Sequence, residues 1–111
     1  MKFLENSCGS VLIVKVLESR ITADVAAGFK EGLTEYIKKG NKIIVLDLSE
    51  VTFIDSSGLG ALIGSLKVMG GNGELLLSGA HEAVMNMFKL THMNKVFRMF
   101  KSPEEALAAI A

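Results

Sequence analysis

The sequence predicts a single α/β domain in which a mostly parallel sheet of four to five strands carries about four helices. Apolar runs of strand length alternate along the chain with segments of helical periodicity, and half of the 111 residues are hydrophobic. A chain of this length and composition forms one domain, residues 1–111, and can bury a core without disulfide or metal support. Strands that alternate with helices favour parallel pairing and right-handed crossovers.

The first part of the chain predicts strands followed by a helix. VLIVKVL, residues 11–17, is rich in β-branched side chains, and a further strand can open the chain around residues 3–6. Residues 22–40 have helical periodicity and end on Lys-Lys-Gly, which suits a helix C-terminus. One face of this helix carries Val25, Phe29, Leu33 and Tyr36.

The middle of the chain predicts a buried strand, a turn and a second helix. KIIVLDL, residues 42–48, is almost continuously apolar, as is typical of a central strand buried on both faces. The next residues, SEVTFI, are interpreted as a turn, and a helix follows over residues 56–73 up to a Gly-Gly-Asn-Gly stop. The apolar stripe of this helix is formed by Leu59, Leu62, Ile63 and Leu66.

The last part of the chain predicts two more strand–helix units. Weaker strands cover residues 74–78 and 95–100, and helices cover residues 81–90 and 102–110. In the final helix Ser102 can cap, and Pro103 fits the first turn.

Charge and cysteine content exclude several classes of protein. Twelve basic residues balance twelve acidic ones, so no overall field attracts nucleic acid, an anionic membrane or an acidic substrate. Cys8 is the only cysteine, which excludes an internal disulfide and a multi-cysteine metal cluster. With no long apolar segment for a signal peptide or a membrane span, we expect a soluble cytoplasmic protein.

The segment FIDSSGLGALIG, residues 53–64, places an acid and two hydroxyls before a run of glycines. It follows a predicted strand and opens a predicted helix, so it lies at the carboxyl edge of the sheet, where open α/β folds gather functional groups. A dinucleotide-binding turn does not fit, because the third glycine of G-x-G-x-x-G would fall on Ile63. The helix also begins before the glycines, so their amides cannot wrap a pyrophosphate.

A serine hydrolase is disfavoured by the surroundings of Ser56 and Ser57. The G-x-S-x-G frame is absent, and the two histidines, His81 and His92, are interpreted as cap or surface residues. Two isolated histidines also make a poor metal site. The sequence therefore predicts no catalytic residue, no metal and no cofactor.

A purely structural interpretation explains Asp55 but not the glycines. Asp55 suits the N-cap of the helix, because its side chain can accept from amides two or three residues on. Glycine inside a helix costs roughly 1 kcal/mol relative to alanine, and a close-approaching partner would offset that cost. On a helical wheel an outward face of small residues is predicted for Ser57, Gly60, Ala61, Gly64 and Val68.

The remaining interpretation is that Ser56 is a displayed phosphoacceptor. It would lie in the first turn of the helix, where the positive end of the helix dipole accommodates a phosphate. A phosphate beside Asp55 and a smooth helix face can switch off a docked partner through repulsion and desolvation.

Over nearly its whole length the chain resembles the anti-sigma factor antagonists of the STAS domain superfamily. The resemblance is carried by IIVLDLSEVTFIDSSGLGALIGSLKVM and by GGNGELLLSGAHEAVMNMFKLTHMNKVF. It implies a non-enzymatic switch in which Ser56 is phosphorylated by a partner anti-sigma factor that is a serine kinase, and dephosphorylated by a PP2C-type phosphatase. The unmodified form would bind the anti-sigma factor and release the sigma factor. The implied contact surface comprises Asp55, Ser57, Gly58, Leu59 and Gly60, with Ala61 and Gly64 from the small-residue face and Thr22 opposite.

One loop departs from the family pattern. Many members carry G-E-[LI]-D there, whereas this chain has SRIT, with Ser19 in place of the glycine and Thr22 in place of an acid. Thr22 still suits a helix N-cap, but the field near Ser56 loses one negative charge. An alternative function therefore stays open, namely a constitutive scaffold or a transporter-associated subunit, for example in phospholipid trafficking, without a phosphorylation switch.

Overall fold

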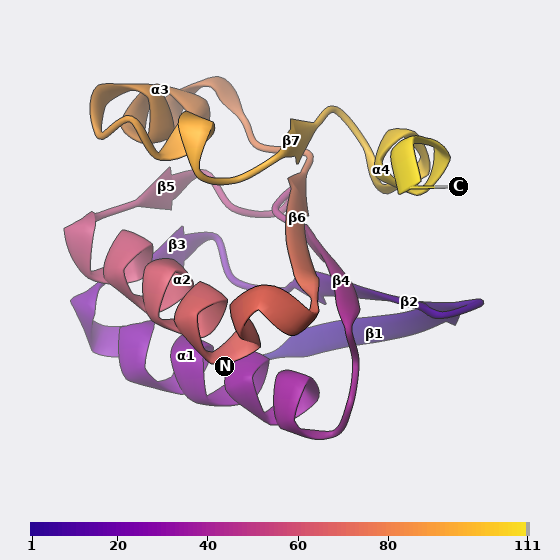
Figure 1. The fold of residues 1–111 in the computed structure, drawn as a ribbon. Helices are drawn as coiled ribbons and strands as arrows, with labels where there is room; N and C mark the ends of the chain where they lie inside the picture. Colours follow the sequence, from indigo (N-terminus) through magenta and orange to yellow (C-terminus); the bar gives the residue numbers. More distant parts are fainter. Residues whose placement is uncertain (111) are drawn as a thin grey trace.

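A computed structural model describes residues 1–110 and contains two sheets and four α-helices. Figure 1 shows the sheet strands at the centre, with α1 and α2 beside one another and α4 apart from them. The strands are β1 (Phe3–Cys8), β2 (Val11–Val16), β3 (Arg20–Ile21), β4 (Ile43–Asp47), β5 (Phe53–Ile54), β6 (Glu74–Ser78) and β7 (Met99–Phe100). The helices are α1 (Ala23–Lys38), α2 (Ser56–Met69), α3 (Glu82–Leu90) and α4 (Pro103–Ile110), with 3-10 turns η1 (Gly70–Asn72) and η2 (Met93–Lys95).

The main sheet has five strands in the order β1-β2-β4-β6-β7. Only the β1–β2 hairpin is antiparallel, and the other three pairings are parallel. β4 lies in the middle, and four of its five residues are buried. The predicted fold class and the central position of residues 42–48 are therefore confirmed.

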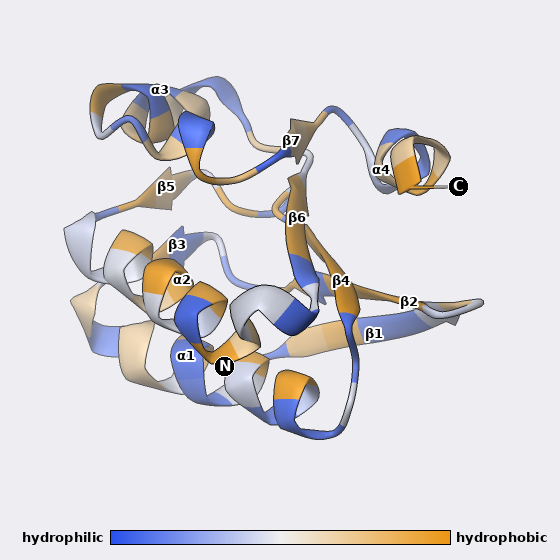
Figure 2. Ribbon diagram, in the orientation of Figure 1, coloured by the Kyte–Doolittle hydropathy of each residue, from blue (hydrophilic) through white to orange (hydrophobic). Residues whose placement is uncertain are grey.

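Helices cover both faces of the main sheet, but unequally. The larger apolar cluster lies between the sheet and the first three helices, with Phe29 of α1, Leu62 of α2 and Phe88 of α3 fully buried. A smaller cluster on the other face brings Ala106 of α4 against Val45 and Leu76. Figure 2 shows that β4 and β6, which serve both clusters, are hydrophobic along most of their length.

The structure corrects two predicted regions. The segment SEVTFI, predicted as a turn, contains β5, which pairs in parallel with β3 to form a separate two-stranded sheet. The predicted strand 95–100 is wrong over residues 95–98, because the chain forms the turn η2 and the Val96 and Phe97 amides donate to the Met93 carbonyl. Phe97 is thereby buried edge-on against Phe88, and only Met99–Phe100 pairs with β6.

Candidate functional site

The candidate site lies where β5 ends and α2 begins. β5 delivers Asp55 to the N-cap position of α2, and the Asp55 Oδ1 atom accepts from the Gly58 amide at 3.0 Å. Ser56 is the first residue of α2, and both Ser56 and Ser57 are exposed. The predicted cap and the predicted position of Ser56 are confirmed.

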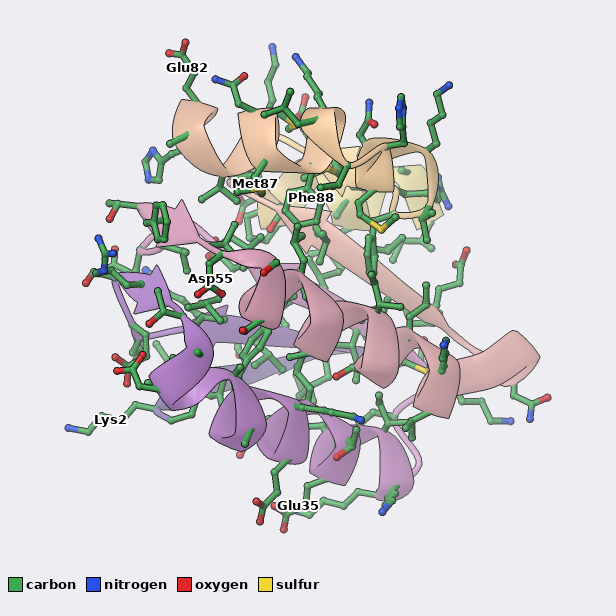
Figure 3. All side chains as sticks on the ribbon, turned by 90° about the vertical axis from the view of Figure 1, so that its left-hand side faces the viewer. Lys2, Glu35, Asp55, Glu82, Met87 and Phe88 are labelled. Atoms are coloured by element: carbon green, nitrogen blue, oxygen red, sulfur yellow. The ribbon has the colours of Figure 1, made fainter. Side chains whose placement is uncertain are left out.

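The Asp55 carboxylate also accepts a hydrogen bond from a second helix, α1. Its Oδ2 atom accepts from the amide of Ala23, the first residue of α1, at 3.2 Å. Figure 3 shows Asp55 between the N-terminal ends of α1 and α2. One carboxylate therefore satisfies an otherwise unpaired amide in each helix and complements the positive ends of both helix dipoles.

Thr22 is the N-cap residue of α1, as predicted, but its hydroxyl does not cap the helix. The hydroxyl donates instead to the carboxylate of Asp24, in the first turn of α1. This hydrogen bond is the main reason why the pKa of Asp24 lies below its usual range, and Arg20 adds a smaller electrostatic effect in the same direction. An acid therefore stands two residues beyond Thr22, at the same helix end.

The glycines of the motif have three different surroundings. A Cβ atom on Gly58 would lie 2.5 Å from the Ile21 carbonyl oxygen and 2.7 Å from Ile54 Cγ1, so Gly58 permits the close packing of α2 on the two-stranded sheet. Gly60 is open, with nothing within 4 Å of such an atom. At Gly64 the space is filled by the end of the Lys30 side chain, which crosses from α1.

The predicted small-residue face is therefore only partly correct. Ser57, Gly60 and Val68 are exposed, but Ala61 is 6% exposed and packs in the larger core. Leu59, at 4%, and Gly58 are buried as well, so these residues support the surface from below. The helical wheel was misleading because α2 packs against the sheet on one side and against α1 on another, which widens its buried face.

Two basic residues lie near the site, and the sequence motif gives no indication of either. Arg20 of β3 lies over the ring of Phe53 of β5, with its Cζ atom 4.5 Å from the ring centre, and both side chains are exposed. Lys30 belongs to α1, and the end of its side chain occupies the space beside Gly64 of α2 that a Cβ atom would fill. Their positions depend on tertiary pairing, which local patterns do not reveal.

The surroundings do not assemble hydrolytic chemistry. The His81 Nε2 atom lies 2.6 Å from the Ser49 carbonyl oxygen. His81 is exposed and occupies the N-cap position of α3, in agreement with the prediction of a cap or surface residue, but its side chain makes no capping hydrogen bond. His92 is exposed beyond the end of α3. No cluster of three or more potential metal ligands occurs within residues 1–110, and no helix in that range is long and apolar enough to span a membrane.

Comparison with known proteins places this geometry in a family. Residues 7–106 match the STAS domain. The anti-sigma-B factor antagonist of Listeria monocytogenes is 31% identical over 80 residues, which is 71% of this chain and 70% of the relative. The chain therefore belongs to the STAS domain family, among the anti-sigma factor antagonists.

Solved structures agree with this assignment. The crystal structure of a putative anti-sigma factor antagonist from Thermotoga maritima has a TM-score of 0.86 and 25% identity, and covers 96% of this chain and 92% of that one. An anti-sigma factor antagonist from Mycobacterium paratuberculosis has a TM-score of 0.88 at 23% identity, covering 97% and 92%, and shows the same fold.

Proposed function

We propose that this chain is an anti-sigma factor antagonist controlled by phosphorylation of Ser56. In its unmodified form it binds an anti-sigma factor that is also a serine kinase, and this releases the sigma factor for transcription. A PP2C-type phosphatase restores the unmodified form. The observation that carries the proposal is the exposed Ser56 hydroxyl at the first position of α2, directly after the capping Asp55.

The electrostatics at this position support a switch that acts through charge. A phosphate adds about −1.5 to −2 charges at neutral pH. The helix N-terminus accommodates that charge, whereas the neighbouring Asp55 carboxylate opposes it. Phosphorylation therefore changes the field at the docking surface strongly without an obligatory change of fold, and a bound partner is released by repulsion and by the cost of desolvating the phosphate.

The loss of an acid at position 22 is compensated in this proposal by Asp24. Asp24 accepts the Thr22 hydroxyl at the N-terminal end of α1, the end that Asp55 joins to α2. The negative charge that the family pattern places at position 22 is thus supplied two residues later. Asp24→Asn should lower the rate of Ser56 phosphorylation, and an unchanged rate would remove Asp24 from the proposal.

The proposed function is tested in a phosphorylation assay with each purified kinase-type anti-sigma factor that the source genome encodes. Incubation with ATP should add one phosphate, seen by intact mass, and Ser56→Ala should abolish it. Ser57→Ala is the matched control and should remain a substrate. Phosphate on the Ser56→Ala variant would move the site elsewhere.

The phosphomimetic Ser56→Asp separates the switch from the constitutive scaffold or transporter-associated alternative. A switch requires that Ser56→Asp lose most of its affinity for the anti-sigma factor. Unchanged binding would mean that the affinity does not depend on the charge at Ser56, and would favour the constitutive scaffold or transporter-associated alternative.

A further inference from the structure

Small side chains from two helices form part of the surface around Ser56. On α2 the exposed residues of the first turns are Ser56, Ser57 and Gly60, and on α1 they include Ala23 and Ala27. Residues three and four apart lie on one side of a helix, so the row Ser56, Gly60, Gly64 continues along α2 and the row Ala23, Ala27, Lys30 continues along α1. α1 and α2 pack side by side (Figure 1).

Lys30 crosses this surface. A Cβ atom on Gly64 would lie 2.8 Å from Lys30 Cε, 3.0 Å from Nζ and 3.3 Å from Cδ, so the end of the side chain lies flat on α2. The single ion pair within residues 1–110 joins Arg98 to Glu74, which leaves the Lys30 ammonium without an acidic partner there. The α2 sequence from Ser56 to Ser65 contains no charged residue.

An ammonium in this position restricts what can dock there. A protein that covers α2 from Ser56 to Gly64 removes water from the Lys30 ammonium, and burying an unpaired charge is costly. The cost is avoided when the partner brings a carboxylate to the ammonium. The exposed residues of α2 that precede Gly64, namely Ser56, Ser57 and Gly60, are small and leave room for that approach.

We propose that Lys30 determines partner specificity by donating to a carboxylate of the docked anti-sigma factor over Gly64. This inference rests on the proposed function for the identity of the partner, and adds the chemistry by which that partner is recognised. Glycine at position 64 then serves the contact indirectly, because the end of Lys30 occupies the space that a side chain at position 64 would fill.

Binding of the purified anti-sigma factor to the unphosphorylated full chain, measured by titration calorimetry, tests the inference. Lys30→Gln should weaken binding about tenfold and Lys30→Glu about a hundredfold, because the charge-reversed variant repels the same carboxylate. Gly64→Ala should also weaken binding, since the new methyl group displaces the end of Lys30 without removing its charge. Raising ionic strength should weaken the wild type more than Lys30→Gln.

Lys38→Glu is the matched control. It makes the same charge change on the same helix, eight residues or about 12 Å further along, and should bind within about twofold of the wild type. Circular dichroism confirms that each variant is folded. On the partner, an Asp or Glu to Lys substitution that restores binding to Lys30→Glu identifies the carboxylate.

The outcomes separate the two proposals. If the wild type binds the anti-sigma factor and Lys30→Glu binds equally well, the Lys30 contact is wrong while the proposed function stands. The contact is also wrong if Lys38→Glu weakens binding as much as Lys30→Glu. If the wild type binds none of the kinase-type anti-sigma factors, the proposed function and the contact both fail.

Discussion

At the scale of single residues, the geometry around Ser56 depends on Asp55 and Gly58. Asp55 accepts one backbone hydrogen bond from each of two helices. Gly58 lets α2 approach the Ile21 carbonyl more closely than any side chain would allow. Both residues belong to the recognisable motif, yet their structural roles differ from those of the exposed Ser56 and Gly60. Stability measurements separate the structural members of the motif from the exposed ones.

Replacing Asp55 should destabilise the protein through both helices. Asp55→Ala removes two caps, each worth about 0.5–2 kcal/mol, and Asp55→Asn should cost less because its amide oxygen keeps one acceptor. Urea unfolding followed by circular dichroism measures the difference. Equal stability of Asp55→Ala and the wild type would contradict the double-cap role.

The two neighbouring glycines should respond in opposite ways to the same substitution. Gly58→Ala should destabilise the fold by several kcal/mol, because its methyl group meets backbone and a buried side chain. Gly60→Ala should stabilise it by up to about 1 kcal/mol through helix propensity, since the position is open. Thermal unfolding compares the pair directly, and similar melting temperatures would show that the packing at Gly58 relaxes easily.

At the scale of elements, the sequence predicts long segments well and short ones poorly. The strand at Glu74–Ser78 is confirmed residue for residue, and the four helices differ from prediction mainly at their ends. β3 and β5 have two residues each, too few to show an alternating pattern, and they exist because the chain pairs them across more than thirty positions. The Lys30 contact with Gly64 was equally invisible, because it depends on how α1 and α2 pack.

The N-terminus of the short helix α4 is capped by side chains. The helix has eight residues, and its N-terminus is closed by the Glu105 amide donating to Ser102 Oγ and the Lys101 amide donating to Glu105 Oε2. Ser102→Ala should therefore speed amide exchange in α4 selectively, with a loss of about 1 kcal/mol in local opening free energy. Hydrogen exchange followed by mass spectrometry distinguishes faster exchange in α4 alone from faster exchange throughout the domain. The second result would mean that α4 unfolds only together with the whole domain.

At the scale of the whole molecule, β4 lies between two apolar clusters of unequal size. Ile44 and Leu46 point into the larger cluster with α1, α2 and α3, whereas Val45 points toward α4. The face that carries the site therefore rests on the larger core.

Substitutions on the two faces of β4 should have unequal effects. Leu46→Ala should cost about 2–5 kcal/mol, a large share of a domain's total stability of about 5–15 kcal/mol. Val45→Ala should cost less, because it removes less side chain from the smaller cluster. Chemical denaturation of both variants checks the order, and a larger loss for Val45→Ala would reverse this assignment of the two cores.

Because the Ala23 amide donates to Asp55, an NMR signal from α1 can report chemical changes at the start of α2. The amide proton resonance of Ala23 responds to the charge on the carboxylate that it contacts, and that carboxylate adjoins Ser56. Its chemical shift should move when Ser56 acquires a phosphate, while Ala23 itself stays chemically untouched. A single backbone resonance, remote in sequence, can thus report the modification state in real time without any label on the serine.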